Sequence, residues 1–117
     1  MVRGLWTGEL NFNVSNILYG HGVFIFHECK VFGGNSKFYF AGTYSLDGEN
    51  IKGQYKVTHY AGDPITPMGL IEEHGTQHFR FKGKIKGSQM EILGILIEDD
   101  HIRFKGMLQK QLGEDIF

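Results

Sequence analysis

The stretch HFRFKGKIKG, residues 78–87, alternates aromatic or aliphatic residues with cations, and its core RFKG returns at residues 103–106. Successive side chains of a β-strand point to opposite faces. One face of this stretch therefore carries the apolar residues Phe79, Phe81 and Ile85. The other face carries His78, Arg80, Lys82, Lys84 and Lys86. The alternation predicts a strand with one buried and one solvated side.

A glycine lies between two apolar residues in six predicted strands, always with one residue on either side of it. Side chains two positions apart share a face, so each glycine is expected on the inward, apolar face. An inward glycine relieves crowding where a sheet coils strongly, and a facing aromatic ring can cover it. The motif occurs at Trp6-Gly8-Leu10, Phe40-Gly42-Tyr44, Ile51-Gly53-Tyr55, Phe81-Gly83-Ile85, Ile92-Gly94-Leu96 and Phe104-Gly106-Leu108.

Two tight turns set the expected strand pairing. A two-residue turn at Gly87-Ser88 places Phe81 opposite Gly94 on the inner face and Lys84 opposite Glu91 on the outer face. Both pairs join residues that suit the same face, so the hydrophobic pattern supports this register.

The second turn signal is Asp47-Gly48, which is typical of a β-hairpin. A two-residue turn there predicts Tyr44 opposite Ile51 and Phe40 opposite Tyr55. This register also keeps the apolar residues of the two strands on one face.

The whole chain shows about eight runs of this kind, which we expect to form one all-β domain over residues 1–117. The fold predicted is an antiparallel up-and-down barrel, because eight strands suffice to close a small barrel. Only residues 63–73 are compatible with a short helix. The expected strands cover residues 3–14, 20–27, 29–34, 37–46, 49–60, 76–86, 89–98 and 102–110.

Composition agrees with this class. The chain has 117 residues, with 17 glycines, ten phenylalanines and five tyrosines, which suits one β-rich domain. It has one cysteine and neither an apolar signal-peptide core nor a membrane-spanning run, which fits a cytoplasmic protein. A net charge of -1 offers no overall field for a polyanion.

Binding of nucleic acid could therefore depend only on a local basic patch. In RNA-binding sheets, the aromatics that stack on bases share the solvent face with basic residues. In residues 78–87 the rings and cations lie on opposite faces, and Glu91 and Glu98 are nearby. We expect a solvated barrel exterior and no nucleic-acid partner.

Catalytic and metal chemistry have weak support. His74 and His78 are four residues apart, but they flank a glycine and a strand start, and no third ligand has a diagnostic spacing. Cys29 follows a histidine by two residues in what we interpret as a bend between two strands. The acid pairs at 72–73 and 99–100 are expected in solvated loops. No enzyme activity, metal or cofactor is predicted.

Two strands are apolar on both faces, which a monomeric barrel with a solvated exterior does not require. They are MEILGILIE (90–98) and GVFIF (22–26). We predict that one or both outer patches are buried in a homodimer, the alternative being cover by the loop at 61–75. The outward residues concerned are Leu93, Ile95, Ile97, Val23 and Ile25.

The barrel interior is expected to be lined by large rings with glycines between them. Two interpretations stay open: a cavity for a small hydrophobic ligand, or a solid core in which the rings fill the space that the glycines leave. The predicted lining residues are Trp6, Phe12, Phe38, Phe40, Tyr44, Tyr55, Phe79, Phe81 and Phe104.

The run GGNSKFYFAGTYSLDGENIKGQYKVTHY (33–60), after the GVFIF strand, resembles the GrlR-type negative regulators of type III secretion and their small lipocalin-like relatives in bacteria. The shared pattern is a Gly-Gly or Gly-Asp turn, an aromatic strand with an inward glycine, a short acidic hairpin and a strand of alternating polarity. The opening GLWTGEL (4–10) resembles the first strand of the same proteins.

The resemblance implies a dimeric, cytoplasmic barrel of the lipocalin or calycin type that acts by protein–protein contact. It also implies an acidic hairpin loop that sequesters a transcriptional regulator. The matching loop is SLDGEN (45–50), with Asp47 and Glu49 as the partner-binding residues. Gly48 and Asn50 replace acidic residues of the family pattern, which halves the charge of the loop. The alternative function is an intracellular carrier of a small hydrophobic ligand.

Overall fold

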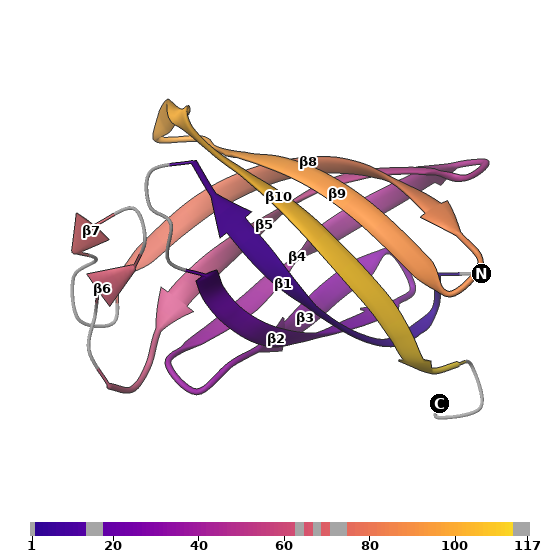
Figure 1. Ribbon diagram of the computed structural model, residues 1–117, viewed down its shortest axis with the longest axis horizontal. Coiled ribbons are helices and arrows are strands. Elements are labelled where there is room, and N and C mark those ends of the chain that lie inside the picture. Colours follow the sequence, from indigo (N-terminus) through magenta and orange to yellow (C-terminus); the bar gives the residue numbers. More distant parts are fainter. Residues whose placement is uncertain (1, 14–17, 63–64, 67–68, 71–74, 114–117) are drawn as a thin grey trace.

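The computed structural model describes residues 2–13, 18–62, 65–66, 69–70 and 75–113. Eight strands close into an antiparallel barrel in the order β1-β10-β9-β8-β5-β4-β3-β2, as Figure 1 shows. The predicted all-β up-and-down barrel is confirmed. Its strands are β1 (Gly4–Phe12), β2 (Leu18–His27), β3 (Lys30–Gly34), β4 (Phe38–Asp47), β5 (Asn50–His59), β8 (Thr76–Lys86), β9 (Gln89–Leu96) and β10 (Asp99–Leu112).

The segment at residues 63–73, which the sequence made compatible with a short helix, has a different structure. Its described residues form a two-stranded antiparallel ribbon of β6 (Ile65–Thr66) and β7 (Gly69–Leu70). The helix is therefore not formed at these positions, since their backbone groups pair across the ribbon. The other residues of 63–73 lie outside the described part of the chain. No helix of the described residues has the length and hydrophobicity to cross a membrane.

The β8–β9 hairpin has the predicted register. Phe81 pairs with Gly94, Lys84 pairs with Glu91, and Gly87 occupies the turn with a φ of 62°. This left-handed conformation is one that glycine adopts at little cost, which explains why the turn forms here.

The predicted β4–β5 register is wrong by two residues. The turn residues are Gly48 and Glu49, so Tyr44 lies opposite Gly53, and Phe40 lies opposite Val57. A shift of two keeps every side chain on its predicted face, so the hydrophobic pattern cannot distinguish the two registers. Space inside the barrel distinguishes them, because the observed register sets a large ring opposite a glycine.

The same arrangement continues around the barrel wall. A row of inward positions runs across β4, β5, β8, β9 and β10 and alternates a ring with a glycine. A Cβ atom added to Gly94 would lie 2.0 Å from the ring of Phe104, so the ring occupies the space above the glycine. The glycines thus make room for rings of the neighbouring strand. The row is Tyr44, Gly53, Phe81, Gly94 and Phe104.

The turn between β2 and β3 is the bend expected at Cys29. Glu28 and Cys29 both have positive φ angles, 49° and 64°, and the flanking residues His27 and Lys30 pair across the hairpin. Two successive left-handed residues match the twist of a tight β-hairpin, but non-glycine residues adopt this conformation at a cost.

Candidate functional site

The interior is filled by the predicted rings, which are all buried. Rings from opposite walls meet: the Phe12 and Phe79 centroids are 6.0 Å apart, and those of Tyr55 and Phe104 are 6.3 Å apart. Tyr55 also stacks on Phe79 at 5.3 Å. Burial raises the pKa of the Tyr44 phenol above its ordinary value of 10.0. These contacts favour the solid core over a ligand cavity at this level of the barrel.

A groove of about 780 Å³ lies on the outside of the barrel, close to the β4–β5 and β8–β9 turns. Most of its lining comes from outward side chains of β4, β5, β8, β9 and β10. Leu93 and Met107 form an apolar part and are 47% and 50% exposed. The polar and charged lining residues include Ser45, Asp47, Asn50, Lys52, Lys82, Lys84, Lys86, Gln89 and Glu91.

The groove belongs to a wider cationic face, which we define as the outward side of β5, β8, β9 and β10. Eight of the 12 lysines and arginines of the chain lie here, and all eight are exposed. Lys52 is directly opposite Lys82 across the β5–β8 pair, with Asn50 opposite Lys84 in the next row. The eight cations are Lys52, Lys56, Arg80, Lys82, Lys84, Lys86, Arg103 and Lys105.

The two acidic residues expected to neutralise this face pair with His78 and with only one of its eight cations. A Glu98 carboxylate oxygen accepts from the His78 backbone N–H at 2.8 Å and lies 2.9 Å from His78 Nδ1. Glu91 is 3.7 Å from Lys105 Nζ. Among the described residues, the structure shows no ion pair for the groove lysines at positions 52, 82, 84 and 86. The cationic face therefore presents an excess of positive charge in a chain of net charge -1.

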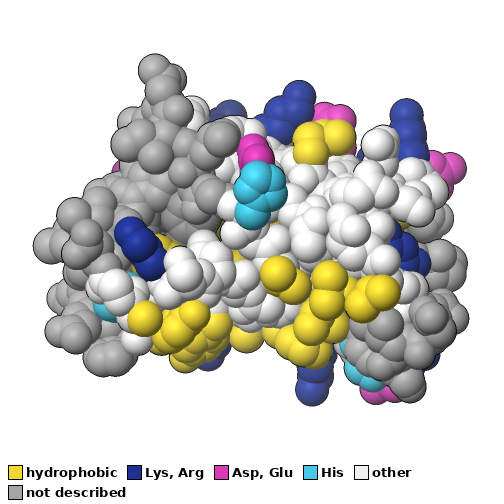
Figure 2. Space-filling model, turned by 60° about the horizontal axis from the view of Figure 1, so that its bottom comes forward, with side chains coloured by type: hydrophobic (Ala, Val, Ile, Leu, Met, Phe, Trp, Pro, Cys, Tyr) yellow, Lys and Arg dark blue, Asp and Glu magenta, His cyan; other side chains and the backbone are white. Residues whose placement is uncertain are grey.

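A second surface, which we call the apolar face, is the outward side of β1–β4. Leu5, Ile25, Phe32 and Ala41 form one row across the four strands. Figure 2 brings the β2–β3 side forward and shows hydrophobic side chains gathered along it. Val23 and Tyr39 lie in the next row and are 39% and 44% exposed. The outward Lys, Arg, Asp and Glu residues of these strands are Glu9, Lys30 and Asp47.

The five residues predicted for the dimer interface divide between these surfaces. Val23 and Ile25 lie on β2 in the apolar face, whereas Leu93 and Ile95 lie on β9 within the cationic face. Ile97 is in the β9–β10 turn and is 45% exposed. Strands β1 and β10 separate β2 from β9, so the five do not form one continuous patch.

The predicted partner-binding loop adjoins the groove. Asp47 is the last residue of β4 and lines the groove, while Glu49 lies in the turn that follows. Both are exposed. The structure thus brings together Asp47 and Leu93, two residues that the sequence assigned to different surfaces.

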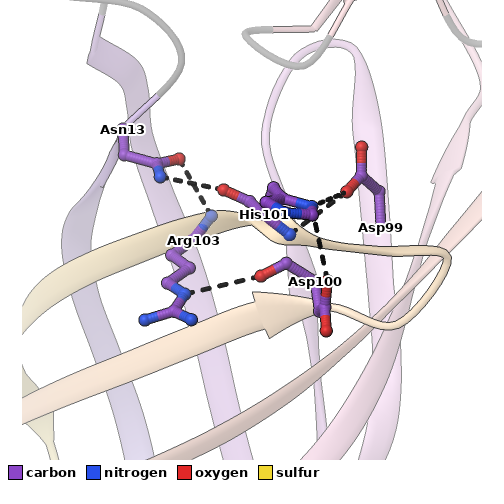
Figure 3. A network of polar contacts seen from close by, with 5 residues as sticks. All are labelled: Asn13, Asp99, Asp100, His101 and Arg103. Carbon is purple, nitrogen blue, oxygen red and sulfur yellow. Dashed lines mark hydrogen bonds and ion pairs between the residues drawn. The ribbon is translucent and has the colours of Figure 1, made fainter.

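The β9–β10 turn contains a polar network, shown in Figure 3. Asn13 bridges β1 to β10: its Nδ2 donates to the His101 carbonyl, and its Oδ1 accepts from the Arg103 backbone N–H, both at 2.9 Å. His101 Nδ1 lies 3.3 Å from Asp99 Oδ1 and 3.5 Å from Asp100 Oδ1. The network joins the end of β1 to the irregular start of β10.

This network also contains a group of three residues with metal-ligand atoms. Asp99, Asp100 and His101 each offer one such atom, and these atoms lie within 4.8 Å of one another. All three residues are exposed and already bond within the turn, so the geometry is explained by the turn itself. His74, the other histidine considered for a metal, lies outside the described residues, and His78 bonds to Glu98.

Sequence comparisons identify no relative of this chain: no family model matches it, and no curated protein matches it either. The site therefore has to be interpreted from its own geometry.

Proposed function

We propose that this chain is a small, non-enzymatic binding protein that holds a protein partner on the outside of its barrel and acts as a regulator or adaptor. The observation that carries the proposal is the location of the groove. The interior is occupied by ring contacts, whereas the groove combines exposed Leu93 and Met107 with cations and Asp47. Exposed apolar side chains within a polar rim are typical of protein interfaces.

The resemblance to the GrlR-type regulators supports the same class of function. Its acidic loop, with Asp47 and Glu49, borders the groove, so a partner seated there would contact both. Sequestration of a transcriptional regulator by this loop remains the specific form of the proposal.

We also propose that the chain forms a homodimer through the apolar face. Ile25 and Phe32 are central in a row that crosses four strands, and Phe32 is 41% exposed. A second copy would cover such a surface, because obligate dimer interfaces are more apolar than the remaining surface. The groove would stay accessible in this arrangement, since its lining comes from other strands apart from Ser45, Leu46 and Asp47 at the end of β4.

Affinity capture from a lysate of the source cells tests the binding function. We expect the wild-type protein to retain a specific partner, and Leu93→Arg to lose it because the arginine blocks the apolar part of the groove. Ile97→Arg is the matched control, since Ile97 is 45% exposed in the β9–β10 turn, outside both the groove and the apolar face. Partner retention by Leu93→Arg would contradict the groove as the binding site.

The acidic loop is tested in the same assay by Asp47→Lys combined with Glu49→Lys. Loss of the partner is expected if the loop contributes to binding. If this double variant retains every specific partner while Leu93→Arg does not, the groove functions without the loop, and the form of the proposal taken from the resemblance is wrong.

A further inference from the structure

The cationic face contains a charge arrangement that the fold alone does not explain. Lys52 and Lys82 are direct cross-strand neighbours on the outer surface of β5 and β8. Like charges directly opposite each other destabilise a sheet. Lys84 lies one row away from this pair, between the uncharged Asn50 on β5 and Glu91 on β9. A ligand that supplies negative charge would remove this repulsion.

Leu93, an apolar residue of the groove, lies between two cations, whereas Met107 lies between Glu91 and Glu9. Across β8, β9 and β10, Lys82, Leu93 and Lys105 form one outward row, so two cations flank an exposed leucine. Neighbouring strands are about 4.8 Å apart, which separates the two lysine Cα atoms by roughly 10 Å. In the adjacent row Met107 lies beside Glu91. Methionine adapts its shape to varied apolar side chains.

We infer, on the basis of the groove as the proposed binding site, that the occupant of the groove is an acidic protein segment with aliphatic side chains between its carboxylates. This occupant is an alternative to a partner held by the acidic loop, because Asp47 and Glu49 would repel it. The carboxylates would approach Lys52, Lys82 and Lys84, while the aliphatic groups would contact Leu93 and Met107. Charge complementarity selects the partner, and the apolar contact distinguishes it from a simple polyanion.

The same surface is less suited to nucleic acid. Single-stranded nucleic acids bind where aromatic rings stack on bases within a basic groove. Among the described residues of β5, β8, β9 and β10, no Phe, Tyr or Trp faces outward. The exposed rings Phe32 and Tyr39 lie on β3 and β4, and Tyr60 follows the end of β5 that is away from the groove, with its ring against Tyr39. The groove thus offers cations and aliphatic groups but no stacking platform.

Binding of three labelled probes measured by fluorescence anisotropy tests the inference. The first probe is a short peptide that repeats the unit Glu-Glu-Leu, the second is a glutamate-only peptide of the same length, and the third is an oligothymidylate with as many negative charges as the first. We expect the Glu-Glu-Leu peptide to bind several-fold more tightly than the other two. Its affinity should fall as salt is added, because salt screens exposed charges.

The critical variant is Lys82→Glu combined with Lys84→Glu, which we expect to weaken binding of the Glu-Glu-Leu peptide by at least ~10-fold. The matched control is Lys37→Glu with Lys56→Glu. Lys37 and Lys56 are exposed lysines that do not line the groove, and the net charge changes by the same amount. The control should bind within about twofold of the wild type, because these lysines lie outside the groove. If the glutamates prevent folding, Lys82→Gln with Lys84→Gln provides the same comparison.

Four results would overturn the inference: no measurable binding of the Glu-Glu-Leu peptide, binding unchanged by the substitutions in the groove, equal loss in the control, or binding of oligothymidylate as tight as that of the peptide. The last result would identify a nucleic-acid surface. Capture of a Leu93-dependent partner together with no peptide binding would refute the acidic segment while leaving the proposed function intact. Failure of both would refute both.

Discussion

The two halves of the barrel exterior differ much more than the two halves of its interior. Inside, both halves are lined by buried apolar side chains. Outside, β5, β8, β9 and β10 carry eight lysines and arginines, whereas Lys30 is the outward lysine or arginine of β1–β4. The lower side of the barrel in Figure 1, where β2 and β3 lie, therefore differs in chemistry from the upper side, with β8 and β9.

This difference indicates which positions the fold constrains. An inward side chain must fit the space left by its neighbours, so the same residue types recur around the wall. An outward side chain has no such requirement, and a solvated exterior needs only scattered polar residues. The apolar row at Leu5 and Ile25 and the opposed Lys52 and Lys82 both depart from that pattern. Each departure is what a binding surface would produce.

The largest effect is expected from glycines beneath the two faces. Gly94→Ala places a Cβ 2.0 Å from the ring of Phe104, a buried ring that packs on Phe12. We expect a loss of about 3 kcal/mol in unfolding free energy. Gly22→Ala, beneath the apolar face, meets ring atoms only at 3.3 Å or more and should change stability by less than about 1 kcal/mol.

Urea unfolding of the two variants measures this difference. Equal losses would show that the ring-over-glycine packing is not specific to the row that contains Gly94.

The second prediction separates the faces by oligomeric state. Sedimentation should give twice the 13.3 kDa of one chain, and Ile25→Glu should weaken self-association by more than ~10-fold, because it places an unpaired charge in an apolar interface. Leu93→Glu should leave self-association unchanged. The reverse outcome would assign the dimer to β9, and a wild-type mass of one chain would exclude the dimer.

A smaller effect is expected at the hairpin turns. Cys29→Gly, next to the apolar face, should raise the unfolding free energy by about 1 kcal/mol, because it relieves a non-glycine residue at a φ of 64°. Gly48→Ala, beside the groove, should lower it by a similar amount. A Cβ there has no atom within 4 Å, so the cost is conformational alone. Thermal or urea unfolding tests both, and a destabilised Cys29→Gly would contradict the prediction.

The smallest effect concerns the opposed lysines. Lys82→Glu converts the pair with Lys52 into opposite charges and should stabilise the isolated protein by about 0.5 kcal/mol, an increase that salt reduces. Lys30 lies opposite the uncharged Thr43, so Lys30→Glu should have little effect on the unfolding free energy. A lower unfolding free energy for Lys82→Glu would show that the cations stabilise the fold. The difference between the two faces would then no longer indicate a binding surface.

Much of the barrel was predictable because burial imposes a period of two. The alternation in residues 78–87 predicted that Phe81 points inward and Lys82 outward. In the structure Phe81 is buried and Lys82 is exposed. The β4–β5 register was not predictable from the same pattern, since a shift by two residues preserves the faces. The choice between the registers depends on the close approach of Tyr55 to Gly42, where an added Cβ would lie 2.6 Å from the Tyr55 Cβ.

The candidate site was less predictable from the sequence than the barrel. Lys82 and Leu93 were each recognised as outward residues, but the sequence treated Glu98 as a neutralising neighbour, whereas it bonds to His78. The sequence did not identify Met107 as a site residue, because a single methionine at an outward position forms no recognisable pattern. Its place beside Leu93 follows from the pairing of β9 with β10.

Local periodicity was sufficient to establish an all-β barrel, the face of each side chain and the hairpin at Gly87, because each depends on residues close together in the chain. Which outward residues become neighbours depends on strand pairings between residues that are far apart in the chain. The pairing of β5 with β8 opposes Lys52 with Lys82, and closure of the barrel at β1 and β10 separates Val23 from Leu93 by two strands. The groove arises from these contacts between distant strands, and so does the contrast between the cationic and apolar faces of the barrel.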